Sequence, residues 1–235
     1  MVATAHPEAL EGRAAEGRSG FFITLEGGEG SGKSTLAAEL ARRLQADGRR
    51  VVLTEEPGGT PLGQQFWRYL RDPQSPPLTP LAELLWFEAA RAQHVETVVR
   101  PALAEGAVVI CDRYNDSSVA YQGFGRGLGR EPVERLNETA TGGLKPDRTL
   151  LLDLPPEDGL ARARLLEEGD GAGKARDAIG GEQLAFHQRV REGFLEIARR
   201  EPGRVIVIDA TRPAAMVAEQ AWRAIKHEAA RRRRA

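Results

Sequence analysis

An eight-residue run near the start of the chain fits a pattern that proteins use to cradle phosphate groups. Residues 27–34 read G-G-E-G-S-G-K-S and match G-x-x-x-x-G-K-[ST] at every constrained position. Glycines let the backbone wrap around phosphate oxygens, while backbone amides and the next helix N-terminus supply positive potential. The run therefore predicts a nucleoside triphosphate site. The residues expected at ATP are Gly27, Gly28, Glu29, Gly30, Ser31, Gly32, Lys33, Ser34 and Thr35.

A carboxylate and an arginine follow the apolar residues 108–111. Phosphoryl transfer needs charge neutralisation and alignment, which Mg²⁺, a lysine and arginines provide. Asp112 and Ser34 are expected to hold Mg²⁺, with Lys33 on the β- and γ-phosphates. Arg113 is expected to bridge donor and acceptor phosphates as a catalytic residue. The alternatives are that Asp112 caps a turn and that Arg113 pairs with Asp112 or Glu56.

Further cations flank the glycine-rich segment 167–173. Arg162, Arg164, Lys174 and Arg176 surround it, and a flexible arginine-bearing segment beside a nucleotide is typical of a lid that excludes water. A lid is therefore predicted at about residues 164–178, with Arg164 and Arg176 as catalytic residues. The alternative is a solvated loop that joins two helices.

The elements that must position these residues alternate between short β-branched runs and longer helical patterns. This alternation predicts an α/β fold, a five-stranded parallel sheet with helices on both faces. Strands are expected at 21–25, 51–54, 107–111, 149–153 and 205–209, and helices at 34–46, 61–70, 81–103, 182–200 and 214–230, with Pro101 bending or dividing the third. Ligands bind beyond the carboxyl ends of such strands. The polar residues there, Glu26, 55–60, 112–114, Asp153 and Asp209, are therefore expected to converge on one crevice.

Composition favours one domain in a reducing compartment. The 235 residues are 41% hydrophobic, enough for a full core, which we place at 20–230 between a disordered leader (1–19) and a basic tail (231–235). Cys111 is the sole cysteine, so no internal disulfide is possible, and a cytoplasmic protein is expected. The four histidines lack metal-ligand spacing, and no run has membrane-spanning length. The net charge of −1 gives no reason to expect a nucleic-acid partner.

Five motifs resemble those of bacterial thymidylate kinase in order and spacing, over about residues 20–230. They are the glycine loop, E-P-G-G-T at 56–60, F-E-A-A-R at 87–91, D-R-Y-N-D-S-S with A-Y-Q-G over 112–123, and G-R-G at 125–127. The resemblance implies a P-loop nucleoside monophosphate kinase-like fold with a mobile lid. It also implies transfer of the γ-phosphate of ATP to thymidine monophosphate in dTTP synthesis, with Mg²⁺, by a cytoplasmic homodimer.

The same resemblance assigns an acceptor pocket. Phe87 would stack on thymine and Arg91 would hydrogen-bond its carbonyl edge, and residues four apart on a helix do share one face. The alternative is that Phe87 is plain core and Arg91 a surface cation. The full set expected at the acceptor is Glu56, Phe87, Arg91, Arg113, Ser117, Tyr121 and Gln122.

Four positions depart from the family pattern. Glu55 stands where arginine often precedes E-P-G-G, and Trp67 replaces the arginine usual eleven residues after the glutamate of that motif. Arg68 or Arg71 could substitute for it. In the lid, D-A-I-G at 177–180 replaces Asp-Arg-aliphatic-Glu, so either Arg176 would take the missing arginine's place or the lid would act with fewer contacts. Glu29 in the glycine loop matches members that keep the catalytic arginine in the lid.

Three other functions compete with this interpretation. One is another P-loop deoxynucleoside or nucleoside monophosphate kinase, against which the pairing of Phe87 with Arg91 favours thymine. A second is a non-catalytic nucleotide-dependent switch, but no N-K-x-D guanine-reading motif occurs. A third, a nucleic-acid-associated ATPase, would rest on the arginines at 231–234 alone.

Overall fold

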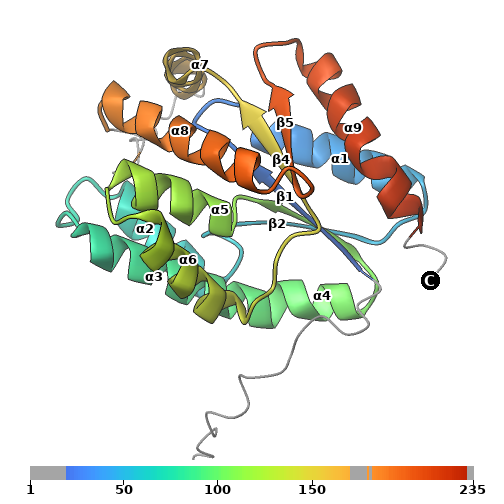
Figure 1. The fold of residues 1–235 in the computed structure, drawn as a ribbon, viewed down its shortest axis with the longest axis horizontal. Coiled ribbons are helices and arrows are strands. Elements are labelled where there is room, and N and C mark those ends of the chain that lie inside the picture. Colours follow the sequence, from blue (N-terminus) through green and yellow to red (C-terminus); the bar gives the residue numbers. More distant parts are fainter. Residues whose placement is uncertain (1–19, 170–178, 180–181, 232–235) are drawn as a thin grey trace, which may run out of the picture.

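Five parallel strands form the centre of the molecule (Figure 1). The computed structural model describes residues 20–169, 179 and 182–231. In these ranges the sheet has the order β2-β3-β1-β4-β5. The strands are β1 (Phe21–Glu26), β2 (Val51–Glu55), β3 (Val108–Asp112), β4 (Arg148–Asp153) and β5 (Val205–Asp209). Each agrees with its predicted range to within one residue at either end, so the predicted fold class is confirmed.

Helices cover both faces of the sheet, and five of the observed segments match the predicted helices. They are α1 (Lys33–Ala46), α2 (Pro61–Arg71), α3 (Pro80–His94), α8 (Leu184–Arg200) and α9 (Ala214–Arg231). The long helix predicted at 81–103 is divided: α3 continues into a π-helical stretch, η2 (Val95–Val99), and then α4 (Arg100–Ala104). Pro101 lies at the start of α4, directly after the π-helical stretch, where a proline removes one hydrogen bond from an otherwise continuous helix.

Four segments were not predicted as helices. They are α5 (Asn115–Ser118), the π-helical η3 (Val119–Gly125), α6 (Arg130–Thr141) and α7 (Pro156–Gly169). In α6 the buried residues are Val133, Asn137 and Thr141, so its inward face is mostly polar. A helix whose inward face is polar has no apolar stripe to reveal it.

Residues alternate between the two faces of the central strand. Phe21, Ile23 and Leu25 pack in a core with α1 and α9, while Phe22 belongs to the core under η2 and α4 on the other face. Figure 1 shows α1 and α9 on one side of the sheet and the remaining helices largely on the other. A third core lies among α2, α3, η3 and α8.

Register brings the carboxyl ends of three neighbouring strands together. Asp112 at the end of β3 pairs in register with Leu25 of β1 and with Glu55 of β2. The loops after β1, β2 and β3 therefore start side by side, and each carries predicted site residues.

Some predictions fall on residues outside the described ranges. These are the leader (1–19), residues 170–178 of the lid with Arg176, and residues 232–235 of the basic tail. In the part of the chain that is described, no helix has the length and apolar character needed to cross a membrane.

Candidate active site

The loop after β1 is tightly packed and needs its glycines. Gly27, Gly30 and Gly32 have φ of 138°, 63° and 90°, values that residues with a side chain rarely adopt. A Cβ on Gly30 would lie 2.1 Å from the carbonyl oxygen of Gly159, at the start of α7. The loop therefore wraps closely between the sheet and α7, as a phosphate cradle requires.

Lys33 begins α1 and points back into this loop. Its Nζ donates to the carbonyl oxygens of Gly27 (3.2 Å) and Gly28 (2.8 Å) and lies 3.3 Å from Ser31 Oγ. Burial and the neighbouring Arg113 lower its pKa to about 8. All three acceptors are neutral, so the ammonium charge is available to phosphate oxygens at the loop.

Ser34 and Asp112 meet across the strand end. Ser34 Oγ donates to Asp112 Oδ2 at 2.7 Å, and both residues line the same cavity. A hydroxyl and a carboxylate beside a phosphate loop are the protein ligands that Mg²⁺ uses in this class of site. Asp112 is thus oriented toward the loop, as predicted.

Arg113 lies at the junction of the phosphate loop and the cavity. Its φ of 69° is unusual for a residue with a side chain. The guanidinium donates to Gly27 O at 3.2 Å and lies 3.4 Å from Ser117 Oγ, 3.9 Å from a Glu29 carboxylate oxygen and 5.0 Å from the Tyr121 ring centroid. The ion-pair alternatives with Asp112 or Glu56 are wrong, because the carboxylate that it approaches is that of Glu29.

A buried carboxyl, Glu26, lies beneath these cations. It is fully buried and accepts hydrogen bonds from the backbone N–H of Tyr114 (2.8 Å) and from Ser117 Oγ (2.6 Å). Burial, with the negative charge of Asp116, raises its pKa to about 8. The sequence placed Glu26 at a strand end but gave no sign of this burial.

Replacing Glu26 with glutamine should change how stability depends on pH. Between the unfolded pKa of 4.5 and the folded value of about 8, the native state holds a proton that the unfolded state lacks. The free energy of unfolding should therefore fall as pH rises through this window in the unmodified protein. In Glu26→Gln this loss disappears. The free energy of unfolding of the variant, relative to that of the unmodified protein, should therefore grow by on the order of 3 kcal/mol from about pH 5 to about pH 8. Urea unfolding across this range measures the difference.

The exposed Glu131→Gln on α6 serves as the control for that comparison. It should follow the unmodified protein at every pH. Parallel curves for Glu26→Gln and the unmodified protein would contradict a shifted titration of Glu26.

A cavity of about 310 Å³ opens next to the phosphate loop. Its walls include Lys33, Ser34 and Asp112 at one end and aromatic side chains at the other. Every residue predicted for the acceptor lines it: Glu56, Phe87, Arg91, Arg113, Ser117, Tyr121 and Gln122. The structure thus brings segments from four parts of the sequence to one place.

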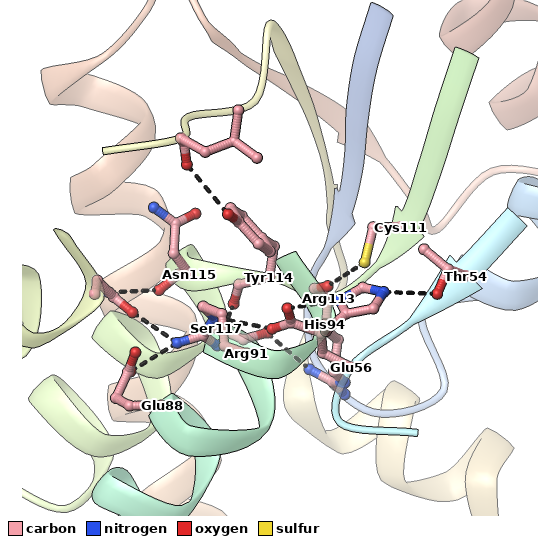
Figure 2. Close-up of polar contacts among 12 residues, drawn as sticks. Thr54, Glu56, Glu88, Arg91, His94, Cys111, Arg113, Tyr114, Asn115 and Ser117 are labelled. Carbon is pink, nitrogen blue, oxygen red and sulfur yellow. Dashed lines mark hydrogen bonds and ion pairs between the residues drawn. The ribbon is translucent and has the colours of Figure 1, made fainter. Parts of the chain in front are cut away.

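Arg91 is held rigidly in the wall of this cavity. Its Nε donates to Glu56 Oε2 (2.9 Å), Nη1 to Glu88 (2.7 Å) and Asn137 (2.7 Å), and Nη2 to the carbonyl of Tyr114 (3.2 Å) (Figure 2). The side chain is 2% exposed, so the alternative that it is a surface cation is wrong. Four of the five N–H groups of a guanidinium are used by described residues, which leaves one on Nη2.

Gln122 is buried in the opposite wall. Its amide nitrogen donates to Glu83 Oε1 at 2.8 Å, and Glu83 in turn accepts from Arg126. Arg126 also pairs with Glu182, just before α8. These contacts tie η3 to α3 and to the start of α8.

A second cavity, of about 740 Å³, lies on the α1 and α9 side of the same loop. It shares Ser31, Gly32 and Thr35 with the phosphate loop and includes Arg162 and Arg212. The stretch 210–215 after β5 supplies much of its remaining wall. Arg212 was not predicted as a site residue, although its place just after a predicted strand end was a usable signal.

Two of the expected strand-end carboxylates do not reach either cavity. Asp153 instead binds Arg191 at 2.7 and 2.9 Å, and Asp209 caps Thr211 and binds Arg212. The expectation that these two carboxylates converge on one crevice with the other strand ends was therefore wrong. Asp153 is bound by an arginine of α8, and Asp209 is bound by the loop that follows β5.

Three arginines that were expected near the phosphates, Arg68, Arg71 and Arg164, do not line the acceptor cavity. Trp67 lines the acceptor cavity, whereas Arg68 reaches back to Gln64 O (3.4 Å) and Arg71 lies 5.8 Å from the Trp67 ring centroid. In the described part of the chain, the cations that line this cavity are Lys33, Arg91 and Arg113. Arg164 is exposed on α7 and is not among the described residues of either cavity wall.

Comparison with known proteins identifies the family. A family model described as thymidylate kinase matches residues 25–221. Thymidylate kinases from Trichlorobacter lovleyi and Synechococcus sp. (strain JA-3-3Ab) are 51% and 52% identical over 84% and 88% of this chain, and over 93% and 95% of their own sequences. The crystal structure of thymidylate kinase from Ehrlichia chaffeensis is 32% identical, with a TM-score of 0.71 over 88% of this chain and 98% of that one. The chain belongs to the thymidylate kinase family of phosphotransferases.

Proposed function

We propose that this protein transfers the γ-phosphate of ATP to thymidine monophosphate and so forms thymidine diphosphate for dTTP synthesis. The observation that carries the proposal is that Lys33 and Arg113 stand where a phosphate loop meets an aromatic cavity that also contains Arg91. A phosphate donor on the loop and a nucleotide in the cavity would thus share the same cations. Membership of the thymidylate kinase family supports thymidine monophosphate as that nucleotide.

The acceptor base is recognised by Phe87 and Arg91 in this proposal. Phe87 presents a half-buried ring to the cavity, and the remaining N–H on Arg91 Nη2 is suited to a carbonyl oxygen. Cytosine would present an amino donor to that N–H, which pairs poorly. In this proposal Tyr121 and Gln122 would lie around the sugar and base, while Ser117 and Glu56 would lie near the phosphate and sugar.

The chain's contribution to transfer is alignment and charge neutralisation. A phosphate monoester has a second pKa of about 6, so its oxygen attacks near neutral pH without a general base. Lys33 would hold the β- and γ-phosphates of ATP, and Arg113 would contact both the donor and the acceptor phosphate. With Trp67 in place of an arginine, Arg113 is the described cation best placed for the acceptor phosphate.

Mg²⁺ fits the pair formed by Ser34 and Asp112. The cation prefers few protein oxygens, together with water and phosphate oxygens, and these two side chains supply a hydroxyl and a carboxylate 2.7 Å apart beside the loop. When bound, Mg²⁺ neutralises charge on the β- and γ-phosphate oxygens. We assign Ser34 and Asp112 as the residues that hold it.

The base of ATP would occupy the second cavity, beside Arg162 and Arg212. The phosphates would then cross the loop toward Lys33. Arg164 and Arg176 remain proposed lid residues that approach the transferred phosphate when ATP is bound. Arg164 lies on α7, whose end leads into the predicted lid.

We also propose a cytoplasmic homodimer without a nucleic-acid or membrane partner. Leu81 and Leu85 are 52% and 47% exposed and lie four residues apart on α3, and the neighbouring α2 exposes Leu62. Such an apolar stripe on two adjoining helices suits a helical interface between two copies.

An acceptor panel tests the proposed reaction. ADP release is measured with ATP and Mg²⁺ while thymidine monophosphate, deoxyuridylate, uridylate, deoxycytidylate and thymidine are supplied in turn. Thymidine monophosphate should give the highest kcat/KM. Preference for thymidine would instead indicate a nucleoside kinase, and nucleotide binding without stimulated turnover would indicate a switch.

A further inference from the structure

A fully buried histidine lies behind the wall of the acceptor cavity. His94 is 0% exposed at the end of α3, one turn after Arg91. Its Nδ1 lies 3.0 Å from Glu56 Oε1, and its Nε2 lies 2.8 Å from Thr54 Oγ1 (Figure 2). Since a carboxylate oxygen only accepts, Nδ1 carries the proton of the first bond, and in the neutral ring Nε2 accepts from Thr54.

The arrangement of hydroxyl, imidazole and carboxylate does not form a nucleophilic site. Among the described residues, neither Thr54 nor His94 lines the acceptor cavity, so no substrate could reach the hydroxyl there. The cavity wall does include Glu56 and Arg91, which are the next two members of the same chain of contacts. The imidazole therefore acts on the cavity through Glu56.

The two oxygens of Glu56 are divided between two donors on one helix. Oε1 faces His94 and Oε2 faces Arg91 Nε, so the Glu56–Arg91 pair is held by a single hydrogen bond. Arginine and carboxylate groups otherwise favour a two-bond pairing. A Glu56 carboxylate released from His94 could turn and bind Nη2 as well, which would occupy the remaining N–H of that nitrogen.

We propose that His94 is a positioning residue for acceptor recognition: by occupying Glu56 Oε1 it keeps the Glu56–Arg91 pair single-bonded and reserves Arg91 Nη2 for the carbonyl oxygen of a pyrimidine base. This inference rests on the proposed function for the identity of the base. The role of His94 is separate from the chemistry of phosphate transfer.

Two substitutions at His94 separate its two hydrogen bonds. The amide nitrogen of asparagine is as many bonds from Cα as Nδ1, so His94→Asn can keep the bond to Glu56 and lose the bond to Thr54. The amide nitrogen of glutamine matches Nε2, so His94→Gln keeps the Thr54 side and frees Glu56. Thr54→Val is the control, because it removes the hydroxyl and leaves the imidazole beside Glu56.

The readouts are Kd for thymidine monophosphate by calorimetry and KM in the coupled assay. His94→Gln should raise both constants by about tenfold, while its kcat and its KM for ATP stay within about twofold of those of the unmodified protein. In His94→Asn and Thr54→Val, the Kd and KM for thymidine monophosphate should stay within about threefold. Binding of deoxyribose 5-phosphate, which has no base, should be equal in all four proteins. Thermal unfolding confirms that each variant is folded.

Distinct outcomes would overturn the two proposals. Equal Kd values for the base-bearing ligand in His94→Gln and the unmodified protein, or an equal loss of deoxyribose 5-phosphate binding, would overturn the positioning role. Absence of thymidylate turnover by the unmodified protein would overturn the proposed function, while the binding comparison still decides the role of His94.

Discussion

Lys33→Ala should lower kcat for phosphate transfer by about 10³-fold or more, the scale of loss when a main charge-stabilising group is removed from a transferring phosphoryl group. The ammonium stands inside the phosphate loop on three neutral acceptors, and no other lysine lines either cavity in the described ranges. Among the described residues, no other ammonium can therefore take its place at the loop. Turnover at saturating ATP and thymidine monophosphate measures the loss.

Stability and binding distinguish this effect from simple unfolding. Burial lowers the pKa of Lys33, so the native state carries a charge at a desolvation cost and the alanine variant should unfold at no lower temperature. Lys226→Ala on α9 is the control and should keep normal turnover. A Lys33→Ala protein that is folded and retains more than about a tenth of kcat would contradict the assignment.

Arg113→Ala should produce the second large loss, about 10²- to 10³-fold in kcat, together with a higher KM for thymidine monophosphate. The guanidinium touches the phosphate loop at Gly27 and reaches Ser117 in the acceptor cavity, so it spans the two substrate sites. Within the described ranges the other cations of this cavity are Lys33, which belongs to the donor loop, and Arg91, which is bonded to Glu56, Glu88 and Asn137.

Arg113→Lys gives a matched comparison at the same position. A lysine restores charge but not the planar fork that contacts two groups at once, so it should recover only part of kcat. Arg223→Ala, an exposed arginine on α9, should have no effect. Full recovery in Arg113→Lys would show that charge alone suffices and would contradict a bridging role.

The strands could be predicted because each is a short run in which apolar residues predominate. Residues 108–111 are almost entirely apolar, and a run of this kind between turn signals is typical of a buried parallel strand. Helix α6 could not be found in this way, because Asn137 and Thr141 occupy part of its buried face. Asn137 accepts a hydrogen bond from Arg91. This contact is part of the tertiary structure and leaves no mark in the local periodicity of the sequence.

That the acceptor residues line one cavity could be predicted from their motifs, whereas the residues that hold them in place could not be predicted. Phe87 and Arg91 stand at a spacing that places them on one face of a helix. Nothing in the sequence indicated that Glu26 would be fully buried or that His94 would meet Glu56, since these contacts join residues that are far apart along the chain. Asp153 was predicted to contribute to the crevice because it ends a strand, but it forms an ion pair with Arg191 of α8 instead.

The indole of Trp67 has a pharmacological consequence. It presents a flat apolar surface to the acceptor cavity where the family pattern leads one to expect a cation. A cation at this position would pair with an anionic group on a nucleotide, whereas the face of an indole packs against an uncharged aromatic ring. An uncharged thymidine analogue with an aromatic ring at its 5′ position could stack on Trp67 instead, and would discriminate this enzyme from relatives that carry arginine there.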